Sequence, residues 1–229
     1  MEGLDPVLPT SWLERLLSRA EEWIYDLNDR GHWLFDLYDW GNEIWARVYF
    51  ARLRERVAKL DVRIEGREAD ARFRLLTPED TEDFVELLSG FDFEYLPPHP
   101  IDREGATRAL RRASYLPFGI YHDGELFCYL LLRLFFPRRV VLGYWAKASH
   151  QARGFSTNAI RCAGRWSRRE GLDHYITVPL DNIYSLRSSV RGGWKIIRTN
   201  SRFHVLLYDP TPEDAAVVEP PWRDSAEES

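Results

Sequence analysis

The 229-residue sequence predicts an α+β fold with a mixed, mostly antiparallel central sheet flanked by helices and preceded by N-terminal helices. Three observations predict it. Short runs that alternate apolar and polar residues, typical of strands, are interleaved with helical segments between about residues 71 and 209. Asp123-Gly124 joins two strand-like runs and is the usual chemistry of a tight hairpin turn. Thr77 followed by Pro78 and several acids is typical of a helix start.

The other elements follow from the same rules. Gly154 introduces a helix that Gly171 closes, and a proline-broken loop, "GFDFEYLPPHP", separates the first two helices of this region. The expected order is a strand at 71–76, a helix at 78–88, a helix at 102–115, a hairpin at 118–136, a strand at 138–149, a helix to about 170, a strand at 174–180, a short helix at 182–193, and a closing hairpin of 194–199 with 202–209.

The N-terminal segment is rich in tryptophan, since five of the nine tryptophans lie in the first 45 residues. We expect a helix at 10–27, capped by Thr10 or Ser11, and a second helix at about 42–60. Their apolar stripes are Trp12, Leu13, Leu16, Leu17, Ala20, Trp23, Ile24 and Leu27, and Ile44, Trp45, Val48, Tyr49, Leu53, Val57 and Leu60. Three interpretations of this surface are open. It packs on the rest of the chain or on a second copy in a homodimer, it binds a partner protein, or it inserts at a membrane surface. The acids interleaved with the aromatics disfavour the membrane.

Three parts follow: a tryptophan-rich helical segment at 1–66, a main domain at 67–210 and a mobile acidic tail at 211–229. The charged stretch "DVRIEGREAD", residues 61–70, is expected to be a connector. A net charge of −5 gives no extended surface for nucleic acid. Cys128 and Cys162 have no metal-like spacing, so we expect no metal site, reduced thiols and a cytoplasmic location. We also expect no signal peptide and no membrane span.

The stretch "HQARGFSTNAI", residues 150–160, leaves a strand and enters a helix with small residues. A strand–helix connection requires small and capping residues in any case. The alternative is an anion site, because a helix N-terminus has N–H groups without acceptors, and Gly154 lets a phosphate approach the backbone. Spacing alone leaves both interpretations open.

The order of elements from Arg72 to Asp209 resembles the GNAT superfamily of N-acetyltransferases over about 140 residues. Members leave their fourth strand through a (Gln/Arg)-x-x-Gly-x-(Gly/Ala) loop. That loop stands here as Gln151, Ala152, Arg153, Gly154, Phe155 and Ser156. Members later show Asn-x-x-Ser/Ala and then Gly-aromatic, matched here by Asn182, Ser185, Gly193 and Trp194.

The resemblance implies that the N–H groups of the Gln151–Ser156 loop bind the diphosphate of coenzyme A, with Asn182 and Ser185 beside the cofactor. It also implies that the main chain around Tyr144, Trp145 and Ala146 holds the pantetheine arm. Gly143 is placed either for a bulge that splays this strand from its neighbour or for simple packing. The implied activity is transfer of an acetyl group from acetyl-CoA to a primary amine, of a small molecule or a protein, by direct attack in a ternary complex.

The implied catalytic groups are less regular than the cofactor loop. The family's tyrosine acid corresponds to Ser189, and Tyr184 on the same helix is a candidate substitute. Glu94, among the aromatics of the proline-broken loop, is the first candidate for the base or the amine anchor. The missing tyrosine favours an alternative, a weakly catalytic coenzyme A-binding module that acts through protein contacts. A third interpretation keeps the fold and changes the donor to a longer acyl group.

Overall fold

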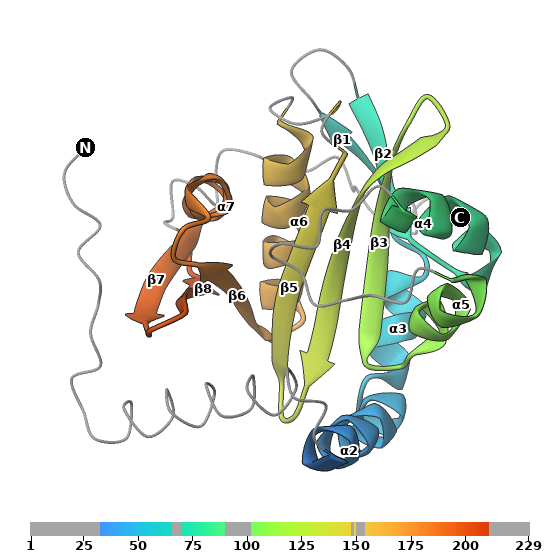
Figure 1. The fold of residues 1–229 in the computed structure, drawn as a ribbon, viewed down its shortest axis with the longest axis horizontal. Helices are drawn as coiled ribbons and strands as arrows, with labels where there is room; N and C mark the ends of the chain where they lie inside the picture. The colour runs from blue at the N-terminus through green and yellow to red at the C-terminus, as the bar shows by residue number, and fades with distance from the viewer. Residues whose placement is uncertain (1–32, 66–69, 90–101, 148, 150–153, 211–229) are drawn as a thin grey trace, which may run out of the picture.

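The computed structural model describes residues 33–65, 70–89, 102–147, 149 and 154–210. Within this part, eight strands and six α-helices form one sheet with helices on both faces (Figure 1). The elements are α2 (Trp33–Tyr49), α3 (Ala51–Val57), β1 (Asp61–Glu65), β2 (Asp70–Leu75), α4 (Thr81–Ser89), α5 (Arg103–Arg111), β3 (Tyr115–His122), β4 (Glu125–Phe135), β5 (Arg139–Ala146), α6 (Phe155–Arg169), β6 (Asp173–Pro179), α7 (Ile183–Arg191), β7 (Trp194–Thr199) and β8 (Phe203–Tyr208).

The strands lie in the order β1-β2-β3-β4-β5-β6-β8-β7. Only β5 and β6 are parallel; every other neighbouring pair is antiparallel. The predicted α+β class with a mostly antiparallel mixed sheet is therefore confirmed. A return connection through α6 joins the parallel pair, as parallel strands require.

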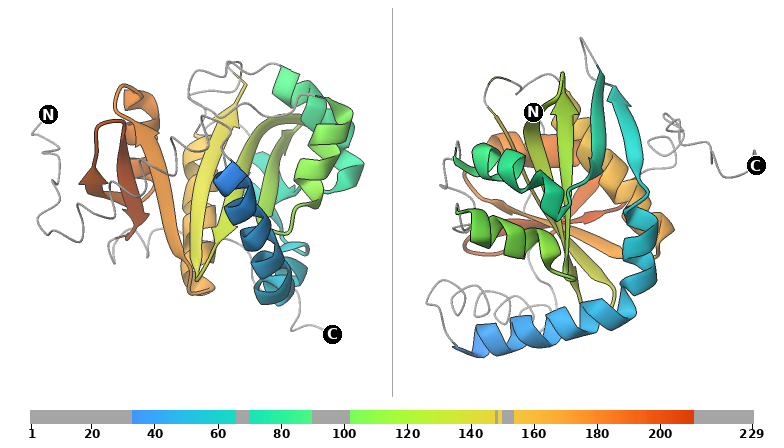
Figure 2. Two further views of the ribbon diagram at one scale, coloured as in Figure 1. Left: turned by 60° about the horizontal axis from the view of Figure 1, so that its bottom comes forward. Right: turned by 90° about the vertical axis from the view of Figure 1, so that its right-hand side faces the viewer.

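Two apolar clusters hold the layers together. On one face, α3 and α6 pack over the sheet (Figures 1 and 2). Phe118, Leu130 and Phe155 are almost fully buried in the cluster on this face. On the other face, α4 and α5 cover Leu76 and Tyr129. Because β-strand side chains alternate, each strand of the sheet centre contributes to both clusters.

The predicted turn and cap chemistry is confirmed at several points. Asp123 (φ 50°) and Gly124 (φ 83°) form the tight turn between β3 and β4. The Thr77 hydroxyl accepts from the Glu79 N–H, and the Asp80 carboxylate accepts from the Thr77 N–H, so a capping box precedes α4. Gly171, with φ 68°, follows α6.

The connector predicted at 61–70 is wrong for its first half, which is strand β1 at the edge of the sheet. Its residues pair with β2, from Asp61 opposite Arg74 to Glu65 opposite Asp70. Val62 and Ile64 are buried, and the charged residues Asp61 and Arg63 that alternate with them are exposed. An edge strand with one solvated face can carry many charges, which hid the alternation.

The N-terminal helices depart from the prediction in extent and in buried face. The predicted helix at 10–27 lies outside the described residues, and the predicted single helix at 42–60 is two helices, of which α2 begins by Trp33. Among the described side chains of α2, Asn42 and Ala46 are buried, as is Phe50 directly after the helix, whereas Ile44 and Val48 of the predicted stripe are exposed. Residues 33–65 still share the core of the sheet; their members of the main cluster are Ala46, Phe50, Leu53, Val57, Val62 and Ile64.

Acidic side chains determine which face of α2 turns inward. The Glu43 carboxylate accepts hydrogen bonds from the Ala113 N–H at 2.7 Å and from the Ser114 N–H at 3.0 Å. Asp39 bridges Arg112 and Arg133, with N–O distances of 2.5 Å to each. These partners satisfy the charges, so α2 buries a partly acidic face. No helix in the described part of the chain combines the length and apolar character needed to cross a membrane.

Candidate functional site

The sheet opens between its two parallel strands. The ladder between β5 and β6 runs from Arg139 opposite Asp173 to Leu142 opposite Ile176 and ends there. Beyond that point β5 stays paired with β4, and β6 stays paired with β8. Gly143 is the first residue of β5 past the last pair, and a Cβ added there would have no heavy atom within 4 Å. The two strands are therefore unpaired with each other beyond Leu142, and we call the unpaired region between them, from Gly143 onward, the slot.

The bulge predicted at Gly143 is wrong, although the predicted splay is present. The register between β4 and β5 is regular from Phe135 opposite Arg139 to Cys128 opposite Ala146. A register shift lies instead between β3 and β4, next to Ile120. The strands diverge because β6 turns toward β8 while β5 follows β4, so an extra residue is not required.

Main-chain groups of β5 point into this slot. The Arg138 carbonyl accepts from the Asp173 N–H at 3.0 Å, and the Lys147 N–H donates to the Phe127 carbonyl of β4 at 2.8 Å. Backbone groups alternate in direction along a strand, so even-numbered residues of β5 direct theirs toward β6. The main-chain groups of Tyr144 and Ala146 therefore face the slot.

Helix α6 begins beside the slot with a left-handed glycine. Gly154 has φ 88° and ψ −14°, and no side chain caps the helix. The first described helical bond runs from the Asn158 N–H to the Gly154 carbonyl, at 3.1 Å. The N–H groups of Phe155, Ser156 and Thr157 therefore have no acceptor within the helix. The first turn holds no acid, so its positive potential is not neutralised from within the helix.

The Phe155 side chain fixes the position of this helix start. It is 2% exposed and packs against Phe127 of β4, with 5.3 Å between ring centroids. The predicted cofactor residue Phe155 thus contributes its backbone at the helix start and its ring to the core. Ser156, its neighbour, is half-buried. Of the predicted loop, Gln151, Ala152 and Arg153 lie outside the described residues.

Helix α7 is linked both to β5 and to the start of α6. The Tyr144 hydroxyl lies 3.3 Å from the Ser185 hydroxyl, which links β5 to α7. The Thr157 and Ser188 hydroxyls are 3.1 Å apart and link the first turn of α6 to α7. The predicted residues Tyr144, Ser156 and Ser185 are therefore brought into one region. Desolvation by burial raises the pKa of Tyr144, against a smaller lowering by hydrogen bonds to serines of α7.

Asn182 is the N-cap of α7. Its Oδ1 accepts a hydrogen bond from the Ser185 N–H at 3.1 Å, which satisfies a donor of the first turn. The motif Asn-x-x-Ser therefore has a local structural cause: the asparagine starts the helix that presents Ser185 to Tyr144.

The acid candidates lie on opposite sides of α7. Ser189 is fully buried, and its hydroxyl has no hydrogen-bond partner among the described residues. Tyr184 is 87% exposed on the outer side of the helix. Glu94, the candidate base, lies outside the described residues. The hydroxyl of Tyr144 was missed as a chemical group, because the resemblance assigned only backbone roles to that strand.

Sequence reasoning also missed a charged cluster at the end of β5. The Lys147 ammonium lies 2.6 Å from the Glu125 carboxylate and 3.8 Å from that of Glu86 on α4. Trp145 is half-buried and packs on the same side of the sheet as α4. At the end of β5, the Tyr144 phenol therefore lies on the α7 side of the sheet, and the carboxylates of Glu86 and Glu125 lie on the α4 side. The register of β4 and β5 brings Lys147 to Glu125, and the packing of α4 on the sheet adds Glu86.

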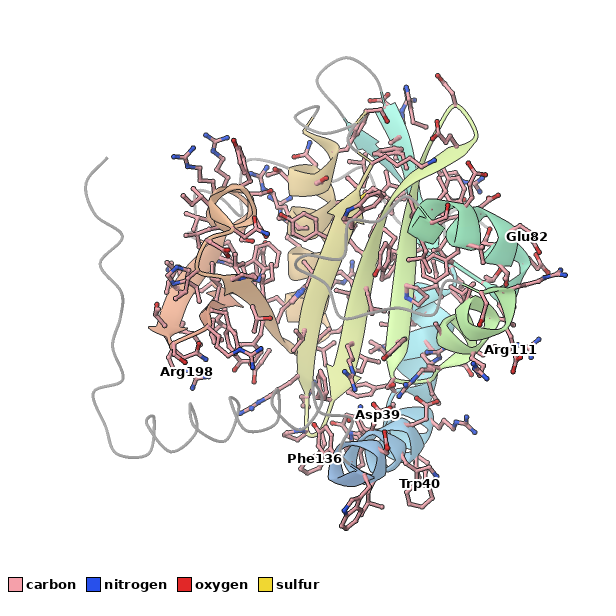
Figure 3. The ribbon with its side chains drawn as sticks, in the orientation of Figure 1. Asp39, Trp40, Glu82, Arg111, Phe136 and Arg198 are labelled. Atoms are coloured by element: carbon pink, nitrogen blue, oxygen red, sulfur yellow. The ribbon has the colours of Figure 1, made fainter. Side chains whose placement is uncertain are left out.

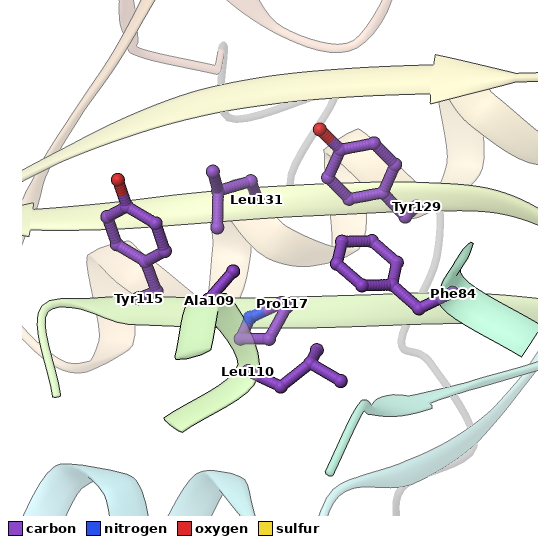
Figure 4. A pocket seen from close by; sticks show the side chains of 7 residues that line it. All are labelled: Phe84, Ala109, Leu110, Tyr115, Pro117, Tyr129 and Leu131. Carbon is purple, nitrogen blue, oxygen red and sulfur yellow. The ribbon is translucent and has the colours of Figure 1, made fainter. Parts of the chain in front are cut away.

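An apolar hollow lies below α5, away from the slot (Figure 4). Its lining residues are Phe84, Ala109, Leu110, Tyr115, Pro117, Tyr129 and Leu131. None of them belongs to β5, β6, α6 or α7. The hollow is therefore separate from the opening between the parallel strands.

Solved structures share this architecture over most of their own length. The GNAT domain of S. lividans PAT is 15% identical with a TM-score of 0.58, covering 65% of this chain and 96% of that domain. The PaiA N-acetyltransferase of Thermoplasma acidophilum, solved with coenzyme A, is 14% identical with a TM-score of 0.52, covering 61% and 98%. AAC(6')-Ib, solved with paromomycin and acetyl-CoA, is 15% identical with a TM-score of 0.53, covering 65% and 97%.

These likenesses define the class of the fold: a mixed sheet opened between two parallel strands, with a helix start at the opening. The chain has the fold of the GNAT superfamily of acetyltransferases, as its motifs indicated. No protein-family model matches the sequence, and no curated protein matches it.

Proposed function

We propose that the protein is an N-acetyltransferase that transfers an acetyl group from acetyl-CoA to a primary amine by direct attack. The observation that carries this proposal is the slot at Gly143 beside the uncapped start of α6. Two proteins of the same fold support the choice of donor, since one was solved with coenzyme A and another with acetyl-CoA.

The diphosphate binds at the start of α6 in this proposal. The N–H groups of the loop Gln151–Ser156 donate to its oxygens, and the helix dipole favours the negative charge. Gly154 permits close approach because it has no Cβ and already occupies the left-handed region. Arg153 adds a positive charge. The pantetheine arm then follows β5, where the main chain of Tyr144 and Ala146 faces the slot, with Trp145 between them and Asn182 and Ser185 alongside.

The reaction forms one bond and breaks another. The lone pair of a neutral amine attacks the acetyl carbonyl carbon, and negative charge develops on the carbonyl oxygen, which a β5 N–H stabilises. Collapse of this intermediate breaks the carbon–sulfur bond and releases the coenzyme A thiolate. The attacking nitrogen loses a proton to a base, and the thiolate gains one. The products are an N-acetylated amine and free coenzyme A.

The proton for the thiolate comes from the α7 side of the slot. Ser189 is a weak acid, and Tyr184 is directed away from β5. We add Tyr144 as the leading candidate, because its hydroxyl is held at Ser185, on the buried side of α7. Its raised pKa keeps the phenol protonated at neutral pH. The thiolate is itself a tolerable leaving group, with a thiol pKa of about 8–9 by analogy with cysteine.

The amine enters from the α4 side in this proposal. Glu94 is retained as the first candidate for the base or the amine anchor. Glu86 and Glu125 at Lys147 add negative charge to that side and favour a cationic amine before it loses its proton.

The experiment is a calorimetric titration with coenzyme A, followed by thiol-release assays with acetyl-CoA over a panel of primary amines. We expect binding, and release that depends on one class of amine. Binding without release on any amine would contradict the transferase proposal and leave a coenzyme A-binding module. Absence of coenzyme A binding would refute the proposed site as a whole.

A further inference from the structure

The outer side of α2 carries a line of exposed apolar side chains. Its members, with their exposed fractions, are Trp33 (64%), Leu37 (54%), Trp40 (63%), Ile44 (44%) and Val48 (78%). We call this line the α2 stripe. The opposite side of α2 is occupied, because Asp39 and Glu43 bind groups of the sheet and its flanking loop. Figure 3 shows Asp39 toward the sheet and Trp40 on the far side of the helix. An uninterrupted apolar line of this length on a surface marks a contact site.

The N-terminal segment has the matching pattern. Within the helix predicted at 10–27, Trp12, Leu16, Ala20, Trp23 and Leu27 are separated by 4, 4, 3 and 4 residues. The α2 stripe is separated by 4, 3, 4 and 4 residues. The second series is the first in reverse, so two antiparallel helices would place these residues opposite one another, pair by pair. In every pair the two residue numbers add to 60, and the small Ala20 falls opposite the large Trp40.

The connection between the two patterns suits an antiparallel hairpin. Residues 28–32, "NDRGH", are five residues long and contain Gly31. Helix–helix connections in compact bundles are about 2–8 residues long, so neighbouring helices joined this way run antiparallel. Residues 12–27 and 33–48 are both sixteen residues long, about 24 Å of helix each.

Other occupants fit the α2 stripe less well. A second copy of α2 could also pack antiparallel on the first. The gaps between its stripe residues would then read 4, 4, 3 and 4 against 4, 3, 4 and 4, so the stripe residues of the two copies would not face each other pair by pair. A membrane surface would meet the exposed carboxylate of Asp36 on the first turn.

We propose that residues 12–27 form a helix that packs antiparallel along the α2 stripe of the same chain, in the register in which paired residue numbers add to 60. In the resulting helical hairpin, α2 lies between the N-terminal helix and the end of β4, to which Asn42 and Asp39 bind. This inference is independent of the proposed activity, since it uses no residue of the slot.

A pair of engineered cysteines tests the register in the full-length chain. In the test pair, Trp23→Cys with Leu37→Cys, the two residue numbers add to 60, so the cysteines face each other in the proposed register. In the control pair, Trp23→Cys with Ile44→Cys, they add to 67, which is an offset of about 10 Å along the helix. A disulfide needs Cα atoms about 4.4–6.8 Å apart, which facing helix positions satisfy and the control does not. Mild oxidation, non-reducing electrophoresis and peptide mapping identify the bond and separate it from Cys128 and Cys162.

We expect an intrachain 23–37 disulfide in most of the protein and a yield at least fivefold lower for the control. A 23–37 bond found only between two chains would overturn the proposal in favour of a swapped dimer. Equal yields in both pairs, or no bond in either, would also overturn it.

Hydrogen exchange of the unmodified chain gives a second measurement that needs no cysteine. We expect amides of residues 12–27 to exchange at least tenfold more slowly than in the variant Trp40→Asp, while Trp40→Leu keeps the protection. Because Trp40 is 63% exposed, neither variant disturbs the core. Rapid exchange of residues 12–27 in the unmodified chain would contradict the proposed hairpin.

Discussion

Replacement of Gly154 by alanine tests whether the start of α6 binds an anion. Gly154 has φ 88°, where an L-residue with a Cβ is strained by about 1–2 kcal/mol. Alanine recovers about 0.4–1 kcal/mol by restricting the unfolded chain, so we expect a net loss of stability of about 1 kcal/mol. The added methyl group also obstructs the phosphate. A lost hydrogen bond to a charged group costs about 1.5–3 kcal/mol, which corresponds to a roughly 10- to 150-fold weaker affinity for coenzyme A.

Gly124→Ala is the matched control for strain alone. Gly124 has φ 83°, lies in the turn between β3 and β4, and a Cβ there would have no heavy atom within 4 Å. Both variants should lower the free energy of unfolding by a similar amount in denaturant titrations. Only Gly154→Ala should weaken coenzyme A binding by calorimetry. An affinity within twofold of the unmodified protein, with the stability loss present, would refute the assignment of the phosphate site.

Four further predictions follow from burial and local bonding. Burial lowers the pKa of His174 to about 3 from an unfolded value of 6.5, so the stability present above pH 6.5 is lost as the pH falls. The free energy of unfolding should be about 2 kcal/mol lower at pH 5 than above pH 6.5. Denaturant titrations at pH 5 and above pH 6.5 should show this difference in the unmodified protein and not in His174→Leu. Asn182→Ala should cost about 1 kcal/mol of stability, and Asn182→Asp, which can still cap α7, should restore it. Tyr144→Phe should lower the turnover of thiol release more than the affinity for coenzyme A; equal turnover would remove Tyr144 as the acid. A chain shortened to 67–210 should show no cooperative unfolding, whereas one of 33–210 should unfold cooperatively, because only the longer chain keeps the six buried side chains that precede residue 67.

Local rules predicted most of the elements between Thr77 and Tyr208. Turn and cap chemistry acts over a few residues, so Thr77, Asp123-Gly124 and Gly154 could be assigned correctly without knowledge of the fold. The splay at Gly143 was predicted with the help of the family resemblance, and the structure shows that pairing with different neighbouring strands, not a bulge, accompanies it.

Long-range pairing explains what the sequence could not predict. Glu43 binds the backbone at Ala113, 70 residues away, and Asp39 binds Arg133, 94 residues away. Periodicity alone treats these acids as solvated, so it did not identify the face of α2 that packs on the sheet. The cluster at Lys147 depends in the same way on the β4–β5 register.

The proposed site has two parts, cofactor binding and proton transfer, which differ in how strictly they require particular side chains. The diphosphate and the pantetheine arm are held mainly by main-chain groups, which many side chains can supply as long as the slot and the left-handed Gly154 are kept. A site of this kind leaves few side-chain identities for a sequence comparison to detect, although the fold is retained. Proton transfer, by contrast, needs a particular side chain at a particular place. A serine at position 189, in place of the family's tyrosine, is therefore compatible with coenzyme A binding. Another group near α7 is then required as the acid. In the proposed mechanism that group is Tyr144, whose hydroxyl lies 3.3 Å from the Ser185 hydroxyl of α7.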